Sequence, residues 1–204
     1  MLSPQEISPA EALERLEQGN RRAVAGEARE RDLPAQVAAL RDGQRPFAAV
    51  LACMDSRVAP ELVFDQDLGD LMSVRVAGNV VGDHVLASLE FAGQGVGVSL
   101  VVVLGHTRCA AVGASLEGEE PGVLSDLVQC IRLAAEGVSE SAGPTSRTSR
   151  EEAFTTAVAI RNVELGVEAL RERSAVLRAL EERGALALVG ALYDVTTGEV
   201  EFLD

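Results

Sequence analysis

Two stretches decide the fold: residues 46–57 have the sequence PFAAVLACMDSR, and residues 99–109 have the sequence SLVVVLGHTRC. Each is an apolar run of strand length that changes abruptly to polar residues. Continuous apolar runs of this length are typical of strands buried on both faces, as in parallel sheets. Cys53 ends the first run, and His106 and Cys109 follow the second. The pattern predicts two parallel core strands that carry polar residues at their carboxyl ends.

Helices alternate with strands along the rest of the chain, which predicts βαβ units. Ser8, Pro9 and Glu11 form a capping box that begins the first helix, which we expect to end near Gly19-Asn20. Further helices are expected at 33–41, at 85–94 with Asp83 as its cap, after Pro121, at 150–172 and at 175–183. Further strands are expected at 71–76, 186–193 and 199–203, the last two forming a hairpin.

The predicted fold class is α/β, with a mainly parallel central sheet flanked by helices, an N-terminal helical arm and a C-terminal antiparallel edge hairpin. The 204 residues suit one domain, with residues 1–43 as the arm and residues 44–204 as the α/β core. The stretch 139–149 (SESAGPTSRTS) is expected to be a loop within it.

The charge of the chain excludes several classes of partner. Against 32 acidic residues stand 18 basic ones, all arginine, so the formal net charge is −14. Such a surface repels phosphate backbones and anionic lipids, and chemistry that needs a lysine amine is excluded. The longest apolar run, 98–104, is far shorter than the ~20 residues of a membrane helix. We therefore expect neither nucleic acid nor a membrane as a partner.

The cysteine count bears on the cellular compartment. There are three cysteines, and residues 1–16 lack the basic and apolar regions of a signal peptide. An odd number of cysteines without a signal peptide indicates reduced thiols, so we expect a cytoplasmic protein.

Cys53, His106 and Cys109 form a candidate metal site. If the two core strands are neighbours, their carboxyl ends bring these side chains to one crevice. Two cysteines and one histidine are ligands that zinc prefers, and three protein ligands leave a fourth position open, as in catalytic sites. The alternative is that the cysteines are small buried packing residues and that His106 is bonded within its turn.

Three short motifs resemble those of a known family. Residues 53–57 (CMDSR), 75–79 (RVAGN) and 105–109 (GHTRC) are similar to the C-x-D-S-R and G-H-x-x-C pattern of the beta-class carbonic anhydrases. The resemblance implies zinc-dependent, reversible hydration of CO2 to bicarbonate and a proton, with Zn²⁺ held by Cys53, His106 and Cys109. It also implies that Asp55 and Arg57 are a catalytic pair. In a closed state Asp55 would be a fourth ligand, unless Arg57 holds it away from the metal.

The resemblance further assigns a substrate pocket to Gln44, Met72, Ala77, Phe91 and Ala110. Two positions depart from the family pattern. Ala110 replaces the usual glycine and narrows the space for bicarbonate, and Val76 replaces a common asparagine.

Two alternative functions stay open on the sequence. The same site can hydrolyse carbonyl sulfide or carbon disulfide, or the chain can be a catalytically silent zinc-binding protein. The resemblance also implies a homodimer or homotetramer, with the helical arm laid across the partner. In agreement, Leu13, Leu16 and their neighbours are expected to be exposed on an isolated monomer.

Overall fold

The computed structural model describes residues 7–117, 122, 124–138 and 147–203, and its centre is a five-stranded sheet of order β2-β1-β3-β4-β5. The first four strands are parallel, and the last is antiparallel to its neighbour. The strands are β1 (Ala48–Cys53), β2 (Leu71–Val76), β3 (Leu100–His106), β4 (Ala187–Tyr193) and β5 (Val200–Leu203). The predicted α/β class, with its antiparallel edge hairpin, is confirmed.

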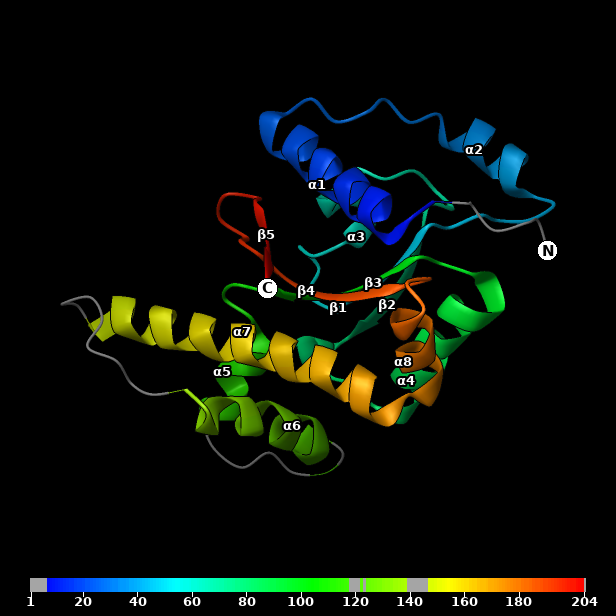
Figure 1. The fold of residues 1–204 in the computed structure, drawn as a ribbon. Coiled ribbons are helices and arrows are strands. Elements are labelled where there is room, and N and C mark those ends of the chain that lie inside the picture. Colours follow the sequence, from blue (N-terminus) through cyan, green and yellow to red (C-terminus); the bar gives the residue numbers. More distant parts are fainter. Residues whose placement is uncertain (1–6, 118–121, 123, 139–146, 204) are drawn as a thin grey trace.

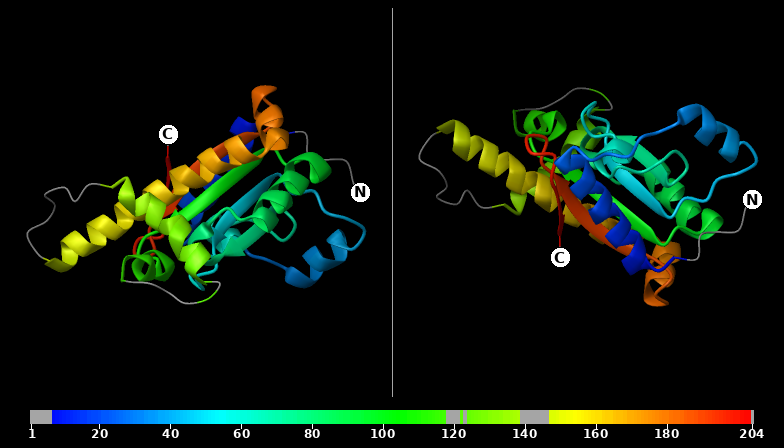
Figure 2. Two further views of the ribbon diagram at one scale, coloured as in Figure 1. Left: turned by 90° about the horizontal axis from the view of Figure 1, so that it is seen from below. Right: turned by 90° about the horizontal axis from the view of Figure 1, so that it is seen from above.

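Helices cover both faces of this sheet (Figures 1 and 2). On one side lie α1 (Pro9–Ala25), α2 (Leu33–Leu40) and the short α3 (Pro60–Val63). On the other lie α4 (Asp83–Glu90), α5 (Ala110–Glu117), α6 (Leu124–Glu136), α7 (Arg147–Arg173) and α8 (Ala175–Glu182). A 3-10 turn, Ala77–Asn79, follows β2, and a π-helical segment, Phe91–Val96, extends α4. The sequence did not predict α3, α5 or the 3-10 turn.

Burial of the sheet on both faces explains the continuous apolar runs in the sequence. Ala49, Leu51, Val101 and Val103 pack with α4, α7 and α8. The alternate residues of β1 and β3 pack with α1 and α3 on the opposite face. Because successive side chains of a strand point to opposite faces, both sets of positions must be apolar when both faces are covered.

Helix α1 begins as predicted but ends later. The Ser8 side chain and Glu11 form the reciprocal capping box, whereas the helix continues past Gly19 to Ala25. The prediction that it ends at Gly19-Asn20 is therefore wrong. A Cβ atom at Gly19 would lie 1.7 Å from the carbonyl oxygen of Phe64, so this glycine permits a close contact with the chain after α3 instead of ending the helix.

The expectation that Leu16 is exposed on an isolated chain is also wrong. Leu16 is fully buried, because α1 packs on the sheet of its own chain and not away from it. Leu13 is partly buried in the same cluster. The exposed large apolar side chains of the N-terminal region are Val24 at the end of α1, which is 42% exposed, and Leu33 and Val37 of α2, which are 55% and 58% exposed.

The start of α4 and the start of α7 differ from the predicted ones. Gly82, and not Asp83, is the N-cap of α4, and Asp83 is the first residue of the helix. Of the predicted loop 139–149, residues 139–146 lie outside the described part, and α7 already begins at Arg147.

In the described ranges, no helix is both long and apolar enough to cross a membrane.

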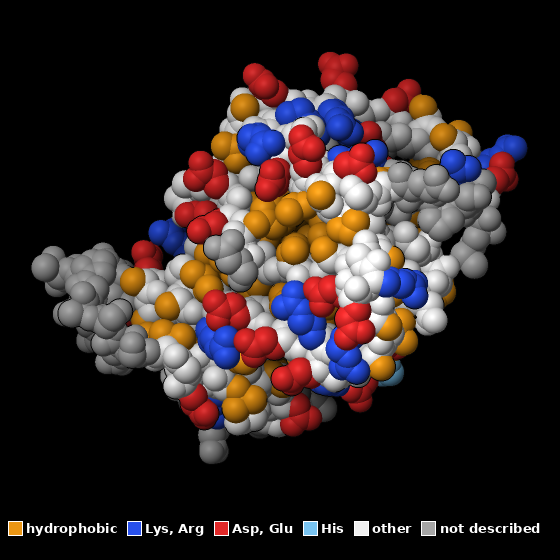
Figure 3. Space-filling model, viewed as in Figure 1, with side chains coloured by type: hydrophobic (Ala, Val, Ile, Leu, Met, Phe, Trp, Pro, Cys, Tyr) orange, Lys and Arg blue, Asp and Glu red, His pale blue; other side chains and the backbone are white. Residues whose placement is uncertain are grey.

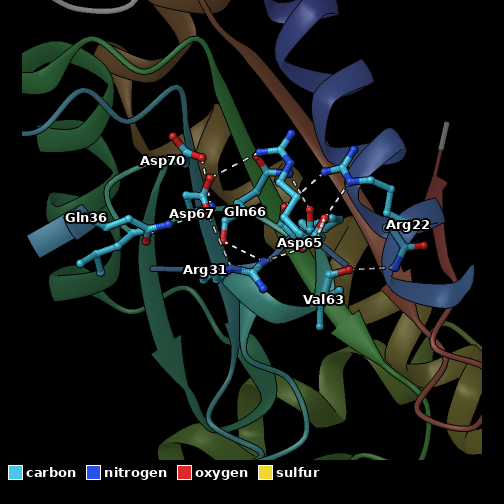
Figure 4. A network of polar contacts seen from close by, with 12 residues as sticks. Arg22, Arg31, Gln36, Val63, Asp65, Gln66, Asp67 and Asp70 are labelled. Atoms are coloured by element: carbon cyan, nitrogen blue, oxygen red, sulfur yellow. Dashed lines mark hydrogen bonds and ion pairs between the residues drawn. The ribbon is translucent and has the colours of Figure 1, made fainter. Parts of the chain in front are cut away.

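A buried carboxylate ties the N-terminal segment to the core (Figure 4). The Asp65 side chain is 1% exposed, and its oxygens lie 2.7 Å from Arg22 Nε and 2.6 Å from Arg31 Nη2. The backbone N–H of Arg29 donates to it as well, at 3.1 Å. Burial opposes the ionisation of Asp65, but these hydrogen bonds outweigh it and lower its pKa.

We expect Asp65→Ala to lower the free energy of unfolding by about 3 kcal/mol, the lower end for a buried pair, because the partly buried Arg22 and Arg31 lose its carboxylate while Arg31 keeps a longer contact of 3.6 Å with Asp67. The wild-type contribution is present above the unfolded pKa of about 3.9 and is lost as the pH falls through the lower folded pKa. Urea unfolding at pH 7 and pH 3 measures both effects. The exposed Glu182→Ala is the control and should change stability by less than about 0.5 kcal/mol; an equally small effect of Asp65→Ala would contradict this account.

Candidate metal centre and active site

Two neighbouring strands bring the three candidate ligands together. Because β1 and β3 are adjacent and parallel, Cys53 and His106 end at the same edge of the sheet. Cys109 returns to this edge after a tight turn in which Arg108 has a φ of 53°. The ligand atoms of the three side chains lie within 4.8 Å of one another, and all three side chains are buried.

The hydrogen bond of His106 fixes which ring nitrogen is free. His106 Nδ1 lies 2.9 Å from the carbonyl oxygen of Thr107. A carbonyl only accepts, so Nδ1 carries the proton and Nε2 presents a lone pair. Nε2 is buried and has no hydrogen-bond partner among the described residues. A buried polar atom without a partner is costly, and a metal bound between this nitrogen and the two sulfurs would satisfy it.

The two sulfur atoms form the other half of the site. Cys53 Sγ lies 3.9 Å from Cys109 Sγ and accepts a hydrogen bond from the backbone N–H of Gly78 at 3.4 Å. The contact with Cys109 is the main cause that lowers the pKa of Cys53, and the same contact raises the pKa of Cys109. A thiolate is the form of cysteine that binds metals. Two sulfurs and one imidazole nitrogen fit zinc and leave room for a fourth ligand.

Asp55 and Arg57 stand beside these ligands as a bidentate pair. Arg57 Nε lies 2.9 Å from Asp55 Oδ1, and Arg57 Nη2 lies 2.8 Å from Asp55 Oδ2. The side-chain hydrogen bond from Arg57 is the main reason that the pKa of Asp55 lies far below its usual range. Arg57 Nη2 also donates to the carbonyl oxygen of Arg108, at 3.3 Å. The carboxylate is therefore ionised and held by two hydrogen bonds from one guanidinium group.

Arg75 contacts the site, and no role was predicted for it from the sequence. It lies on β2, where it pairs with Ala52 of β1. Its Nε donates to the carbonyl oxygen of Cys53 at 3.1 Å, and its Nη2 donates to that of Asp55. Arg75 thus fixes the backbone that carries a candidate ligand and the acidic member of the pair. Its place in the RVAGN stretch was the only signal of this role.

The structure divides the five predicted substrate residues into two groups. Gln44, Met72 and Phe91 line one open cleft of about 700 Å³. Met72 pairs with Ala49, four residues before Cys53, which places it about 13 Å along the strand from the metal-binding end. Ala77 and Ala110 lie at that end. Ala77 follows Val76, which pairs with Cys53, and Ala110 follows Cys109. One chain therefore does not bring all five residues around the three ligands.

Comparisons with known proteins agree with this site. Residues 48–200 match the family model described as carbonic anhydrase. Carbonic anhydrase 2 of Mycobacterium tuberculosis is 37% identical over 203 residues, covering 97% of this chain and 94% of that protein. The carbonic anhydrase of Mycolicibacterium smegmatis is 38% identical over 203 residues, covering 95% and 93%.

Solved structures give the same family. A chain from a study of two tetrameric beta-carbonic anhydrases of Sordaria macrospora matches with a TM-score of 0.74 and 25% identity, over 84% of this chain and 87% of that one. A beta-carbonic anhydrase of Aspergillus fumigatus matches with a TM-score of 0.71 and 26% identity, over 96% and 90%.

These matches do not favour the two alternatives, hydrolysis of carbonyl sulfide or carbon disulfide and a silent zinc-binding protein. The chain belongs to the beta-class carbonic anhydrases, zinc enzymes that catalyse the reversible hydration of CO2 to bicarbonate and a proton.

Proposed function

We propose that Cys53, His106 and Cys109 hold the catalytic zinc of this carbonic anhydrase and that Asp55 and Arg57 are its catalytic pair. The observation that carries the assignment is the buried Nε2 of His106, which has no hydrogen-bond partner among the described residues, in a group whose ligand atoms, one from each of Cys53, His106 and Cys109, lie within 4.8 Å of one another. When bound, zinc supplies a nucleophile for CO2 at neutral pH by lowering the pKa of water.

Asp55 orients the attacking water in this proposal. Its Oδ1 accepts two hydrogen bonds, from the backbone N–H and Nε of Arg57, whereas its Oδ2 accepts one. A carboxylate oxygen can accept two, so Oδ2 has a lone pair for the water. Because its pKa is low, Asp55 is ionised and able to accept at neutral pH. Positioning of this kind lowers the entropic cost of bringing water to CO2.

Arg57 keeps the site open. A free carboxylate next to the metal would itself be a ligand for zinc and would fill the fourth position. The bidentate contact with Arg57 places a hydrogen bond on each oxygen of Asp55 and directs the carboxylate to the guanidinium group, while one lone pair of Oδ2 stays available to the water. We therefore propose that the fourth position is available to water at neutral pH, and that release of Asp55 from Arg57 is what would close it.

The cleft of Gln44, Met72 and Phe91 supports an oligomer, a dimer or a tetramer. Phe91 is 56% exposed and lies with the apolar Met72 beside the exposed amide of Gln44. We propose that a second copy of the chain covers this cleft, where these residues complete the substrate pocket of the partner's metal site. The unpaired edge of β5 and the apolar patch between α1 and α7 in Figure 3 offer further surface for self-association.

Two further proposals concern the domain organisation and the location of the protein. We propose that residues 1–204 are one domain, since α1 contributes Ala12 and Leu16 to the same core as the sheet. We also propose a cytoplasmic location, for which Cys53, Cys109 and Cys130, all free thiols, are the support.

Removal of zinc with a chelator is expected to abolish CO2 hydration, and one equivalent of Zn²⁺ per chain is expected to restore it. Mg²⁺ should not restore activity, because thiolate and imidazole ligands disfavour it. Stopped-flow hydration assays combined with metal analysis measure both results. Full activity in protein that contains less than about 0.05 zinc per chain would contradict the proposal, because so little bound metal is negligible.

A further inference from the structure

Asn162 links α7 to the turn that follows β2. It is buried in the middle of α7, and its Nδ2 donates a hydrogen bond of 2.9 Å to the carbonyl oxygen of Gly78. The two residues are 84 positions apart in the sequence. A buried carbonyl needs a partner, and Asn162 supplies a hydrogen bond to this one.

Gly78 in turn contacts a metal ligand. Its backbone N–H donates to Cys53 Sγ at 3.4 Å, and its φ is +62°, a conformation that favours glycine. A Cβ atom at this position would lie 2.6 Å from Cδ1 of Ile131 on α6. The peptide groups on either side of Gly78 are thus bonded to Cys53 and to Asn162, and α6 packs tightly against the Cα atom between them.

We propose that Asn162 is a positioning residue of the metal centre, which acts through Gly78 to keep a backbone N–H on the sulfur of Cys53. This inference rests on the proposed role of Cys53 as a zinc ligand. Without the Asn162 amide, the buried carbonyl of Gly78 loses that partner, and the turn gains from rotating to find another. Rotation at Gly78 meets little steric resistance from the residue itself, so the N–H moves away from the sulfur.

The N–H of Gly78 affects metal binding through the negative charge on the sulfur of Cys53. It withdraws electron density from the Cys53 sulfur and fixes the direction of its lone pairs. Groups that hold a metal ligand in this way change metal affinity by about 10–100-fold when they are removed. Because Asn162 acts through one intervening residue, we expect an effect at the lower end of this range.

The test compares wild type with Asn162→Leu, which is similar in volume but has no donor. Competition with a chelator should show zinc affinity about 10-fold lower than that of wild type. In protein loaded with Co²⁺, the absorption band from thiolate to metal should move to longer wavelength, because the sulfur loses the N–H and becomes the better electron donor. A role in stability alone would not move this band.

Matched variants separate the proposal from a general loss of packing. Leu170→Ala removes a fully buried side chain from the same helix and should leave the zinc affinity and the cobalt band of wild type, although it destabilises the fold. Asn162→Gln retains an amide donor and should recover part of the affinity. If Asn162→Leu does not fold, Asn162→Ser replaces it, since a serine hydroxyl is too short to reach the Gly78 carbonyl.

The results distinguish two kinds of failure. A wild-type cobalt protein without a thiolate band would overturn the assignment of Cys53 as a ligand, and this inference with it. A normal wild-type band with an unchanged band and affinity in the Asn162 variant would overturn this inference and leave the metal site intact. Equal shifts in the Asn162 and Leu170 variants would also overturn it.

Discussion

His106→Ala is expected to lower the affinity of the protein for zinc by more than about 100-fold and to abolish CO2 hydration. Removing a residue that only supports a ligand costs about 10–100-fold in metal affinity, so losing a ligand itself should cost more. The truncation leaves a cavity at a fully buried position and lowers the free energy of unfolding, but the chain should still fold, because Nε2 has no hydrogen-bond partner in the described structure and Nδ1 loses a single hydrogen bond, to the adjacent Thr107. Zinc titration against a competing chelator, with far-UV circular dichroism, measures both properties.

His84→Ala is the matched control for this variant. His84 is the other histidine of the chain and is exposed at the start of α4. It should retain the zinc affinity of wild type. Wild-type zinc affinity in His106→Ala, or an equal loss in His84→Ala, would contradict the assignment of His106 as a ligand.

Asp55→Asn is expected to lower kcat by about 10²–10⁴-fold while one zinc per chain stays bound. The range is that of a side chain that positions a proton or accepts it in the reacting state. Asparagine keeps the shape and a carbonyl that can accept from Arg57, but it lacks the negative charge that orients water. Because Cys53, His106 and Cys109 are unchanged, the metal should remain.

Asp83→Asn is the control for the loss of one carboxylate charge. Asp83 also pairs with an arginine, Arg173, at 2.6 Å, but it lies at the exposed start of α4. Its kcat should stay within about twofold of wild type, as expected for an exposed ion pair. If Asp55→Asn keeps wild-type kcat, its catalytic role is wrong; if it loses zinc together with activity, its role is to retain the metal.

The three candidate ligands were predictable from the sequence because local signals and topology agree. Cys53 and His106 each end an apolar strand, and parallel neighbouring strands bring their carboxyl ends to one edge. No long-range information was needed beyond the assumption that the two strands are neighbours. The register of β1 and β3 confirms that assumption.

Two predictions from the sequence, for Gly19 and Leu16, were wrong because a tertiary contact and not a local pattern determines the structure there. Gly19 was interpreted as a helix terminator, yet it permits the contact between α1 and the carbonyl of Phe64. Leu16 was expected to be exposed because the sheet face that covers it lies more than 30 residues further along the chain. Local patterns do not show which surface a helix meets.

Other features could not be predicted from a single sequence. Asn162 bonds to Gly78 across 84 positions, and an asparagine inside a helical pattern gives no sign of such a partner. Gln44, Met72 and Phe91 were grouped with the ligands by resemblance, whereas the register places Met72 four residues from the level of Cys53. That separation depends on strand pairing, which residue types alone do not determine.

Stopped-flow CO2 hydration by protein with one zinc per chain, at pH 7 and at pH 9, tests the central claim most directly. The account predicts hydration at both values, because Arg57 holds Asp55 away from the metal and the low pKa of Asp55 keeps the pair charged throughout this range. Hydration at pH 9 only would show that the site is closed at neutral pH. No hydration at either value, with zinc bound, would contradict the account.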